Sequence, residues 1–235
     1  MAGPRTPKGR ARAVAARLAD EYPEAICELD HRGPFELLTA TILSAQTTDA
    51  RVNMVTPHLF ARYPDAPALA AAAPADVEEI IRSTGFYQAK TKSIIGMAQA
   101  VLDRFDGEVP TRLEDLVTLP GVGRKTGNVV RSVAFALPGL PVDTHVGRLS
   151  RRLGLTTEED PVKVETDLCA MLPRAGWGDF SLRLILHGRR VCLAKSPRCA
   201  VCALEDLCPS SLLPRRRSRM PKGSAQRDQE VTQPG

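Results

Sequence analysis

Apolar residues recur along most of this chain at the three- and four-residue spacing of amphipathic helices. Ala, Leu, Arg and Glu dominate the sequence, and the alternating β-branched pattern of strands is scarce, so we expect an all-α protein. Prolines and glycines punctuate the pattern and set the expected helix ends. Helices are expected over residues 10–22, 34–44, 47–63, 74–84, 90–105, 111–119, 124–136, 144–153, 162–172 and 180–191.

Composition narrows the class of protein. The chain has 235 residues, with 43% hydrophobic and 25% charged side chains, which is typical of one large or two small globular domains. No apolar run approaches the roughly 20 residues of a membrane helix, and the N-terminus has no secretory pattern. We therefore expect a cytoplasmic protein without a membrane partner. Aromatic residues are only 4%, which argues against a single-strand binder built on stacked rings.

The net charge of +5 is unevenly distributed. Residues 1–20 and 211–235 each carry +4, which leaves −3 for the body of the chain. The basic, polar segment 211–235 is predicted to be a disordered tail. Within the body, residues 119–152 hold six basic side chains and one acid, and residues 182–203 hold five basic side chains and no acid. Such runs are either solvated helix faces or surfaces for a polyanion.

Four of the six cysteines form a cluster within 17 residues, with the pattern C-x6-C-x2-C-x5-C: Cys192, Cys199, Cys202 and Cys208. Disulfides are one interpretation, but four thiols in so short a segment favour one metal centre. Zinc and a [4Fe–4S] cluster both accept four thiolates, and the spacing alone leaves both open. Cys27 and Cys169 stand apart and are interpreted as small buried apolar residues.

A glycine-rich turn joins two expected helices at LPGVGRKTG, residues 119–127. Gly121 and Gly123 permit a tight turn that leaves backbone N–H groups uncovered, and the following helix directs its dipole at the same place. These features suit a phosphate, although a plain helix–turn–helix connection uses glycine in the same way. The spacing differs from that of an ATP-binding loop, and no strand is expected before it.

Two side chains near this turn have the chemistry of a reaction centre. Lys125 falls in the first turn of the new helix, where the dipole and partial burial would favour a neutral amine that can form a Schiff base. The alternative is a surface lysine that grips phosphate. Asp143, in PVDTH, is either a helix N-cap or a carboxylate presented to a cleft, and the two roles are compatible.

Three blocks occur together in this chain: LPGVGRKTGNVV at 119–130, VDTH at 142–145, and LHGRRVC at 186–192 followed by the cysteine pattern. Together they resemble the endonuclease III family of helix-hairpin-helix DNA glycosylases. The earlier blocks LSAQTTD at 43–49 and TGFYQAK at 84–90 agree with this resemblance, which extends from about residue 22 to 209.

The resemblance implies a two-lobed all-α fold with a DNA cleft between the lobes. A six-helix barrel with the hairpin would span residues 27–137, and residues 1–26 with 138–210 would form an iron–sulfur lobe. By this resemblance the four cysteines bind a structural [4Fe–4S] cluster, whose loop, including Lys195 and Arg198, meets the DNA backbone.

The resemblance also assigns roles to residues. Lys125 matches the catalytic lysine and Asp143 the catalytic aspartate. Gln46 matches the glutamine that fills the space left by an everted base, and Phe86 stands where relatives often carry a leucine wedge. The remaining expected DNA contacts are in the hairpin: Gly121, Val122, Gly123 and Arg124. Gly127 stands where many relatives have alanine.

The activity implied is base-excision repair of double-stranded DNA with a damaged base or abasic site, by a monomer. Oxidised or ring-saturated pyrimidines would be excised, and a Lys125 Schiff base would cleave the strand by β-elimination. A monofunctional glycosylase for mismatched or alkylated bases is the alternative enzyme, and a non-catalytic DNA-binding protein is the alternative class.

Overall fold

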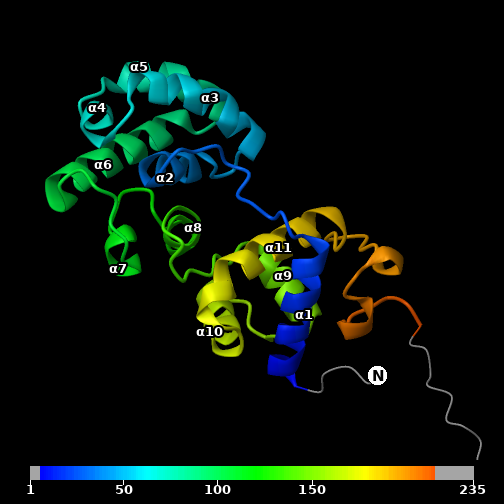
Figure 1. The fold of residues 1–235 in the computed structure, drawn as a ribbon. Helices are drawn as coiled ribbons and strands as arrows, with labels where there is room; N and C mark the ends of the chain where they lie inside the picture. Colours follow the sequence, from blue (N-terminus) through cyan, green and yellow to red (C-terminus); the bar gives the residue numbers. More distant parts are fainter. Residues whose placement is uncertain (1–5, 215–235) are drawn as a thin grey trace, which may run out of the picture.

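The computed structural model describes residues 6–214, and all regular structure in that range is helical, as expected for an all-α protein. Figure 1 shows the helices in chain order. The first six are α1 (Pro7–Glu21), α2 (Pro34–Leu43), α3 (Asp49–Arg62), α4 (Ala66–Ala70), α5 (Pro74–Ile81) and α6 (Tyr87–Phe105). They are followed by α7 (Leu113–Leu116), α8 (Arg124–Ala134), α9 (Thr144–Arg152), α10 (Pro161–Met171) and α11 (Trp177–Arg190). Short 3-10 turns lie at Arg82–Thr84, Arg174–Gly176, Cys199–Val201 and Glu205–Leu207.

Local capping explains two of the differences between the structure and the expected helices. α1 begins earlier than residue 10 because the Thr6 hydroxyl accepts a hydrogen bond from the Gly9 N–H, with Pro7 in the first turn. The unexpected one-turn helix α4 is capped by Asp65, whose carboxylate accepts from the Ala68 N–H at 2.9 Å. Helix α6 begins at Tyr87 rather than at residue 90.

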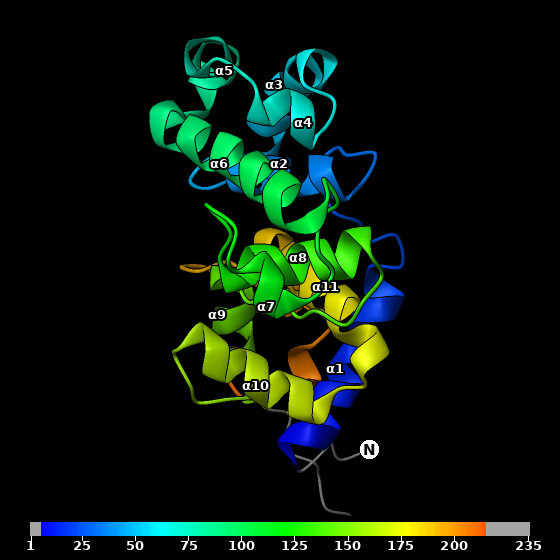
Figure 2. The same ribbon diagram turned by 90° about the vertical axis from the view of Figure 1, so that its left-hand side faces the viewer.

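The buried apolar residues form two separate clusters. One draws on residues 29–130 and lies among α2–α8, with Leu37, Leu38 and Ile94 fully buried. The other draws on α1 and on residues 140–207, with Leu18 and Leu149 at its centre. Figures 1 and 2 show the two helical groups on either side of α8, which contacts both α2 and α11.

Polar contacts also join the two groups. Arg124 on α8 donates two hydrogen bonds, each 2.8 Å long, to the carboxylate of Glu165 on α10. Arg189 on α11 pairs with Glu28 and with Asp49, the latter at 3.2 Å. Bidentate arginine–carboxylate pairs fix orientation as well as distance, so these contacts set how the two groups face each other.

The basic tail expected over residues 211–235 lies outside the described residues from residue 215 onwards. Across residues 6–214, no helix combines the length and apolarity that a membrane span requires.

Candidate functional site

The hairpin between α7 and α8 exposes its backbone. Gly121 adopts φ +75°, and a Cβ there would lie 2.8 Å from the Cβ of Ser93, so glycine is required by both conformation and space. Val122 is buried and anchors the turn to the first apolar cluster, whereas Gly121, Gly123 and Arg124 are exposed. Gly123 caps α8 without a side-chain hydrogen bond, so the first N–H groups of α8 face outward and can bind an anion.

The next turn of α8 explains a departure from the family pattern. Gly127 is buried, and a Cβ at this position would lie 2.7 Å from Cδ1 of Leu113 on α7. The side chain of Leu113 therefore occupies the space that a methyl group at position 127 would need, and no functional group is lost.

Lys125 lies in the first turn of α8 and is exposed. The partial burial that would favour a neutral amine is absent from the free protein. Because the side chain is open to solvent, any desolvation of its amine has to come from a bound ligand that covers it.

Asp143 is the N-cap of α9, and its Oδ1 accepts from the Val146 N–H at 2.8 Å. The side chain is only half-buried, so its carboxylate is both a cap and part of the adjoining pocket. Asp143 can therefore cap α9 and present a carboxylate to the pocket at the same time.

Lys125 and Asp143 line the same pocket, which has a volume of about 530 Å³ and lies between α8 and the start of α9. Sequence reasoning missed four other ionisable residues that line it: His145, Arg151, Glu159 and Arg189. Burial lowers the pKa of His145 despite the opposing effect of Asp143, so its imidazole is uncharged at neutral pH. His145 belongs to the VDTH block, so its position beside Asp143 could have been expected. No sequence pattern predicted that Arg189 lines the same pocket.

Gln46 and Phe86 occupy two neighbouring loops, after α2 and before α6. Both have left-handed backbones, with φ of 55° and 47°, and such positions cost about 1–3 kcal/mol for a residue with a side chain. Both side chains are exposed, and Phe86 is 69% exposed, which is unusual for a large aromatic residue. The left-handed backbones of these loops therefore lower the stability of the folded protein, while they place two side chains in solvent.

The expected contacts of Arg124, Lys195 and Arg198 remain predictions, and the structure qualifies the first of them. The guanidinium of Arg124 is already held by Glu165, so part of its charge is compensated within the protein. Lys195 and Arg198 are exposed in the loop between the first two clustered cysteines.

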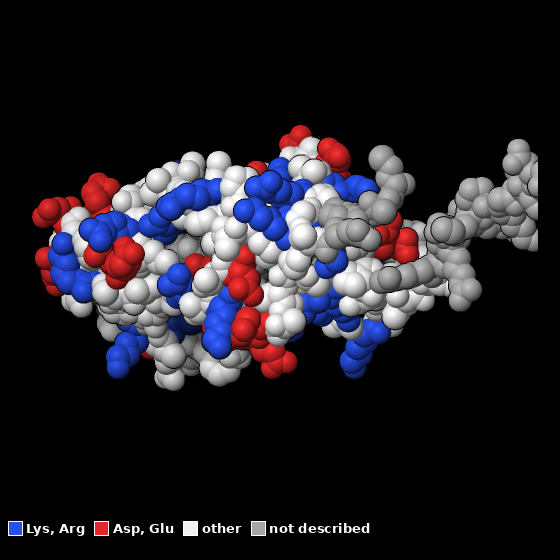
Figure 3. Space-filling view, turned by 90° about the horizontal axis from the view of Figure 1, so that it is seen from below, with Lys and Arg blue, Asp and Glu red and all other residues white. Residues whose placement is uncertain are grey.

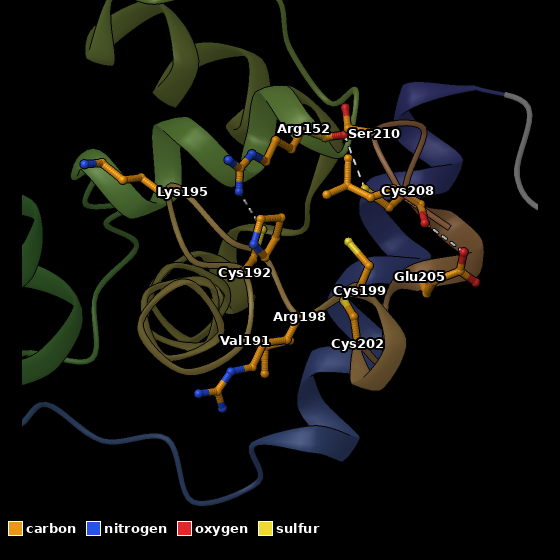
Figure 4. Close-up of a pocket in the computed structure, with 13 residues that line it drawn as sticks. Arg152, Val191, Cys192, Lys195, Arg198, Cys199, Cys202, Glu205, Cys208 and Ser210 are labelled. Atoms are coloured by element: carbon orange, nitrogen blue, oxygen red, sulfur yellow. Dashed lines mark hydrogen bonds between the residues drawn. The ribbon is translucent and has the colours of Figure 1, made fainter. Parts of the chain in front are cut away.

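The four clustered cysteines line one pocket of about 380 Å³, shown in Figure 4. All four are free thiols and half-buried. Arg152 donates to Cys192 Sγ at 3.3 Å, and His187 Nε2 lies 3.3 Å from Cys202 Sγ. Burial raises the pKa of the Cys202 thiol to about 11 and also raises the pKa of Cys208, so a metal centre would have to displace protons from them.

In the described part of the chain, no group of three or more Cys, His, Asp or Glu side chains meets the geometry of a single metal-ion site. The two isolated cysteines lie outside the pocket that the four clustered ones share. Cys27 packs against the first apolar cluster and Cys169 against the second, and burial raises the pKa of both. They are therefore protonated and act as small apolar residues.

Lysine and arginine side chains lie along much of the face seen in Figure 3, interrupted by groups of acidic side chains. The positive surface is therefore divided into separate patches, in agreement with the slightly acidic body of the chain.

Comparisons with known proteins agree with this arrangement. Residues 39–174 match the family described as HhH-GPD superfamily base excision DNA repair protein. The chain is 54% identical to Endonuclease III of Synechocystis sp. over 205 residues, which cover 87% of this chain and 94% of that one. A solved non-covalent Endonuclease III–DNA complex is 43% identical with a TM-score of 0.82, covering 86% of this chain and 95% of the other. A trapped Endonuclease III–DNA covalent intermediate is 44% identical, also with a TM-score of 0.82, covering 86% and 96%.

Proposed function

Because the chain belongs to the endonuclease III family of the HhH-GPD superfamily, we propose that it is a bifunctional DNA glycosylase and abasic-site lyase of base-excision repair. Its substrate is duplex DNA that contains an oxidised or ring-saturated pyrimidine. The observation that carries the proposal is the shared pocket of Lys125 and Asp143, because an amine and a carboxylate are the two groups that this reaction needs. Duplex binding and base eversion involve residues around that pocket.

Duplex binding uses backbone groups rather than base contacts. The N–H groups of Gly121 and Gly123, the first N–H groups of α8 and the dipole of that helix hold a backbone phosphate without reading sequence. The N–H of Val122 is used within the hairpin, because it donates to the Leu119 carbonyl at 3.1 Å. Lys195 and Arg198 add positive charge at the cysteine loop. The two apolar clusters support a division into lobes of residues 27–137 and of residues 1–26 with 138–210, and the pocket of Lys125 lies where they meet.

Eversion of the damaged base precedes chemistry. Oxidised and ring-saturated pyrimidines stack and pair poorly, so they leave the helix at lower cost than normal bases. The exposed ring of Phe86 wedges into the stack, and Gln46 occupies the space that the base leaves.

After its ammonium has given up a proton, Lys125 attacks C1′ of the sugar. The damaged base leaves with the electron pair of the glycosidic bond and takes up a proton. Asp143 stabilises the positive charge that develops on the sugar and helps to move the proton lost by the amine. Ring opening produces an imine between Lys125 and C1′. The imine acidifies the 2′ hydrogen, and loss of this proton expels the 3′ phosphate and cuts the strand.

Trapping with sodium borohydride tests this function, because hydride reduces only an imine to a stable amine. Purified protein should become covalently attached to duplexes with an abasic site or an oxidised pyrimidine, and not to an undamaged duplex. Base release from lesion DNA without any trapped adduct would replace this proposal with a monofunctional glycosylase. If the protein neither releases bases nor forms an adduct, it is a non-catalytic DNA-binding protein.

The cysteine pocket fits a [4Fe–4S] cluster. It offers four free thiols around a hollow of about 380 Å³, which is more room than a single zinc ion fills. Arg152 and His187 each place a nitrogen 3.3 Å from a sulfur, and N–H donors stabilise thiolate charge. When bound, the cluster cross-links the loop of residues 192–208 and so holds Lys195 and Arg198 in place.

The cluster proposal has a direct readout. Protein purified without oxygen should be yellow-brown with a broad thiolate-to-iron absorption band and about four iron atoms per chain. Cys202→Ser should lose both, because a hydroxyl is a poor iron ligand, whereas Cys169→Ser should keep both. Colourless wild-type protein with one equivalent of zinc would show that the site is a zinc site instead.

A further inference from the structure

The loops that carry Gln46 and Phe86 are fastened to each other by a single polar cluster. Lys90, in the first turn of α6, donates from Nζ to Thr47 Oγ1 at 2.9 Å and to the Thr84 carbonyl oxygen at 2.8 Å. The Thr47 hydroxyl in turn donates to the same Thr84 carbonyl. We call Thr47, Thr84 and Lys90 the loop clasp.

Lys90 is an unusual choice for such a position. Only 5% of the residue is exposed, and burial lowers the pKa of its amine. In residues 6–214 it takes part in no ion pair, so its charge is held by neutral oxygens alone. Burying an ammonium without a carboxylate is costly, and packing alone would be served by an apolar side chain of the same length.

The clasp adjoins both strained residues. Gln46 directly precedes Thr47, and Phe86 follows Thr84 by two positions. Phe86 is also the N-cap of α6, and its carbonyl accepts the first helical hydrogen bond, from the Lys90 N–H at 3.0 Å. Lys90 therefore bonds to both loops at once, and each loop ends in an exposed side chain with a left-handed backbone.

We propose that Lys90 is a positioning residue that sets the separation and direction of Gln46 and Phe86, so that the two side chains enter the duplex together. This inference rests on the proposed function. It assigns the clasp to base eversion and not to the chemistry at Lys125. Loosening the clasp should slow eversion of a paired lesion, while cleavage at an abasic site, which has no base to extrude, should be spared.

Each of the decisive variants removes one polar group of the clasp, with the two hydrogen bonds that this group makes. Lys90→Met keeps the length of the side chain and removes the ammonium, and Thr47→Val keeps the shape and removes the hydroxyl. Thr47→Ser restores the hydroxyl. Lys92→Met is the matched control, because Lys92 is an exposed lysine on the same helix. Thermal unfolding of each variant establishes that it is folded.

The measurement compares two rates for each full-length protein under single-turnover conditions. Unstacking is followed by the fluorescence of 2-aminopurine placed opposite an oxidised pyrimidine, and lyase activity by cleavage of a duplex with a preformed abasic site. Lys90→Met and Thr47→Val should slow unstacking roughly tenfold and change abasic-site cleavage less than about threefold. Thr47→Ser and Lys92→Met should match the wild type in both.

Two results would overturn the clasp. Unstacking at the wild-type rate in folded Thr47→Val shows that the contact positions nothing, and an equal loss of both rates shows a general structural role. If Lys90→Met does not fold, the Thr47 pair decides alone. The proposed function fails separately, when wild-type protein cannot be trapped on abasic DNA by borohydride.

Discussion

Lys125→Gln should eliminate strand cleavage and borohydride trapping while leaving the affinity for lesion-bearing DNA nearly unchanged. Glutamine keeps a polar side chain of similar reach but has no nucleophilic amine, so no imine forms. Removal of a covalent nucleophile typically lowers turnover by about 10³-fold or more. Cleavage under single-turnover conditions and DNA binding by fluorescence anisotropy measure the two quantities independently.

Lys163→Gln is the matched control for this experiment. Lys163 is an exposed lysine on α10 whose only described ion pair is a weak one with Glu158, at 3.6 Å. It should cleave at the wild-type rate. A Lys125→Gln protein that still cut abasic DNA near that rate would show that another amine forms the imine.

Asp143→Asn is expected to lower turnover about 10²- to 10³-fold with little change in DNA affinity or stability. The structure makes this substitution informative, because an asparagine oxygen can accept the Val146 N–H that Asp143 now binds. The helix cap is thus preserved, and only the negative charge in the pocket is removed. Single-turnover rates, anisotropy and thermal unfolding separate these effects.

Asp143→Ala removes the cap as well, and it should lower the free energy of unfolding by about 1 kcal/mol in addition to the loss of turnover. Comparison of the two variants separates the contribution of the helix cap from that of the negative charge. If Asp143→Asn were as unstable as Asp143→Ala, or lost affinity along with turnover, the capping role would be the main one.

Elements with regular apolar spacing were predictable from the sequence, and elements set by a single cap were not. Helices α2, α8 and α9 follow from periodicity, and each begins at the residue expected from the sequence. Helix α11 was also expected, but it begins at Trp177 rather than at residue 180. The one-turn helix α4 depends on the Asp65 cap and is too short to show a period. The early start of α1 depends in the same way on Thr6 and Pro7.

In the candidate site, too, some residues could be predicted from local sequence and others could not. Lys125, Asp143 and the four cysteines belong to contiguous motifs. The residues alone left their roles open, and the resemblance of these motifs to a known family assigned the expected roles. Arg189 and Lys90 could not be found in this way, because their roles arise from partners far along the chain, at Asp49 and Thr47. The exposure of Lys125 was also missed, because a position in a helix does not by itself determine solvent access.

The left-handed backbones at Gln46 and Phe86 have a consequence for engineering. Glycine at either position would relieve strain, and stability screens should therefore favour it. The same exchange deletes the side chain that the loop presents. Selection for thermal robustness alone would thus drift toward variants that tolerate heat better and repair DNA worse, and the two properties have to be screened together.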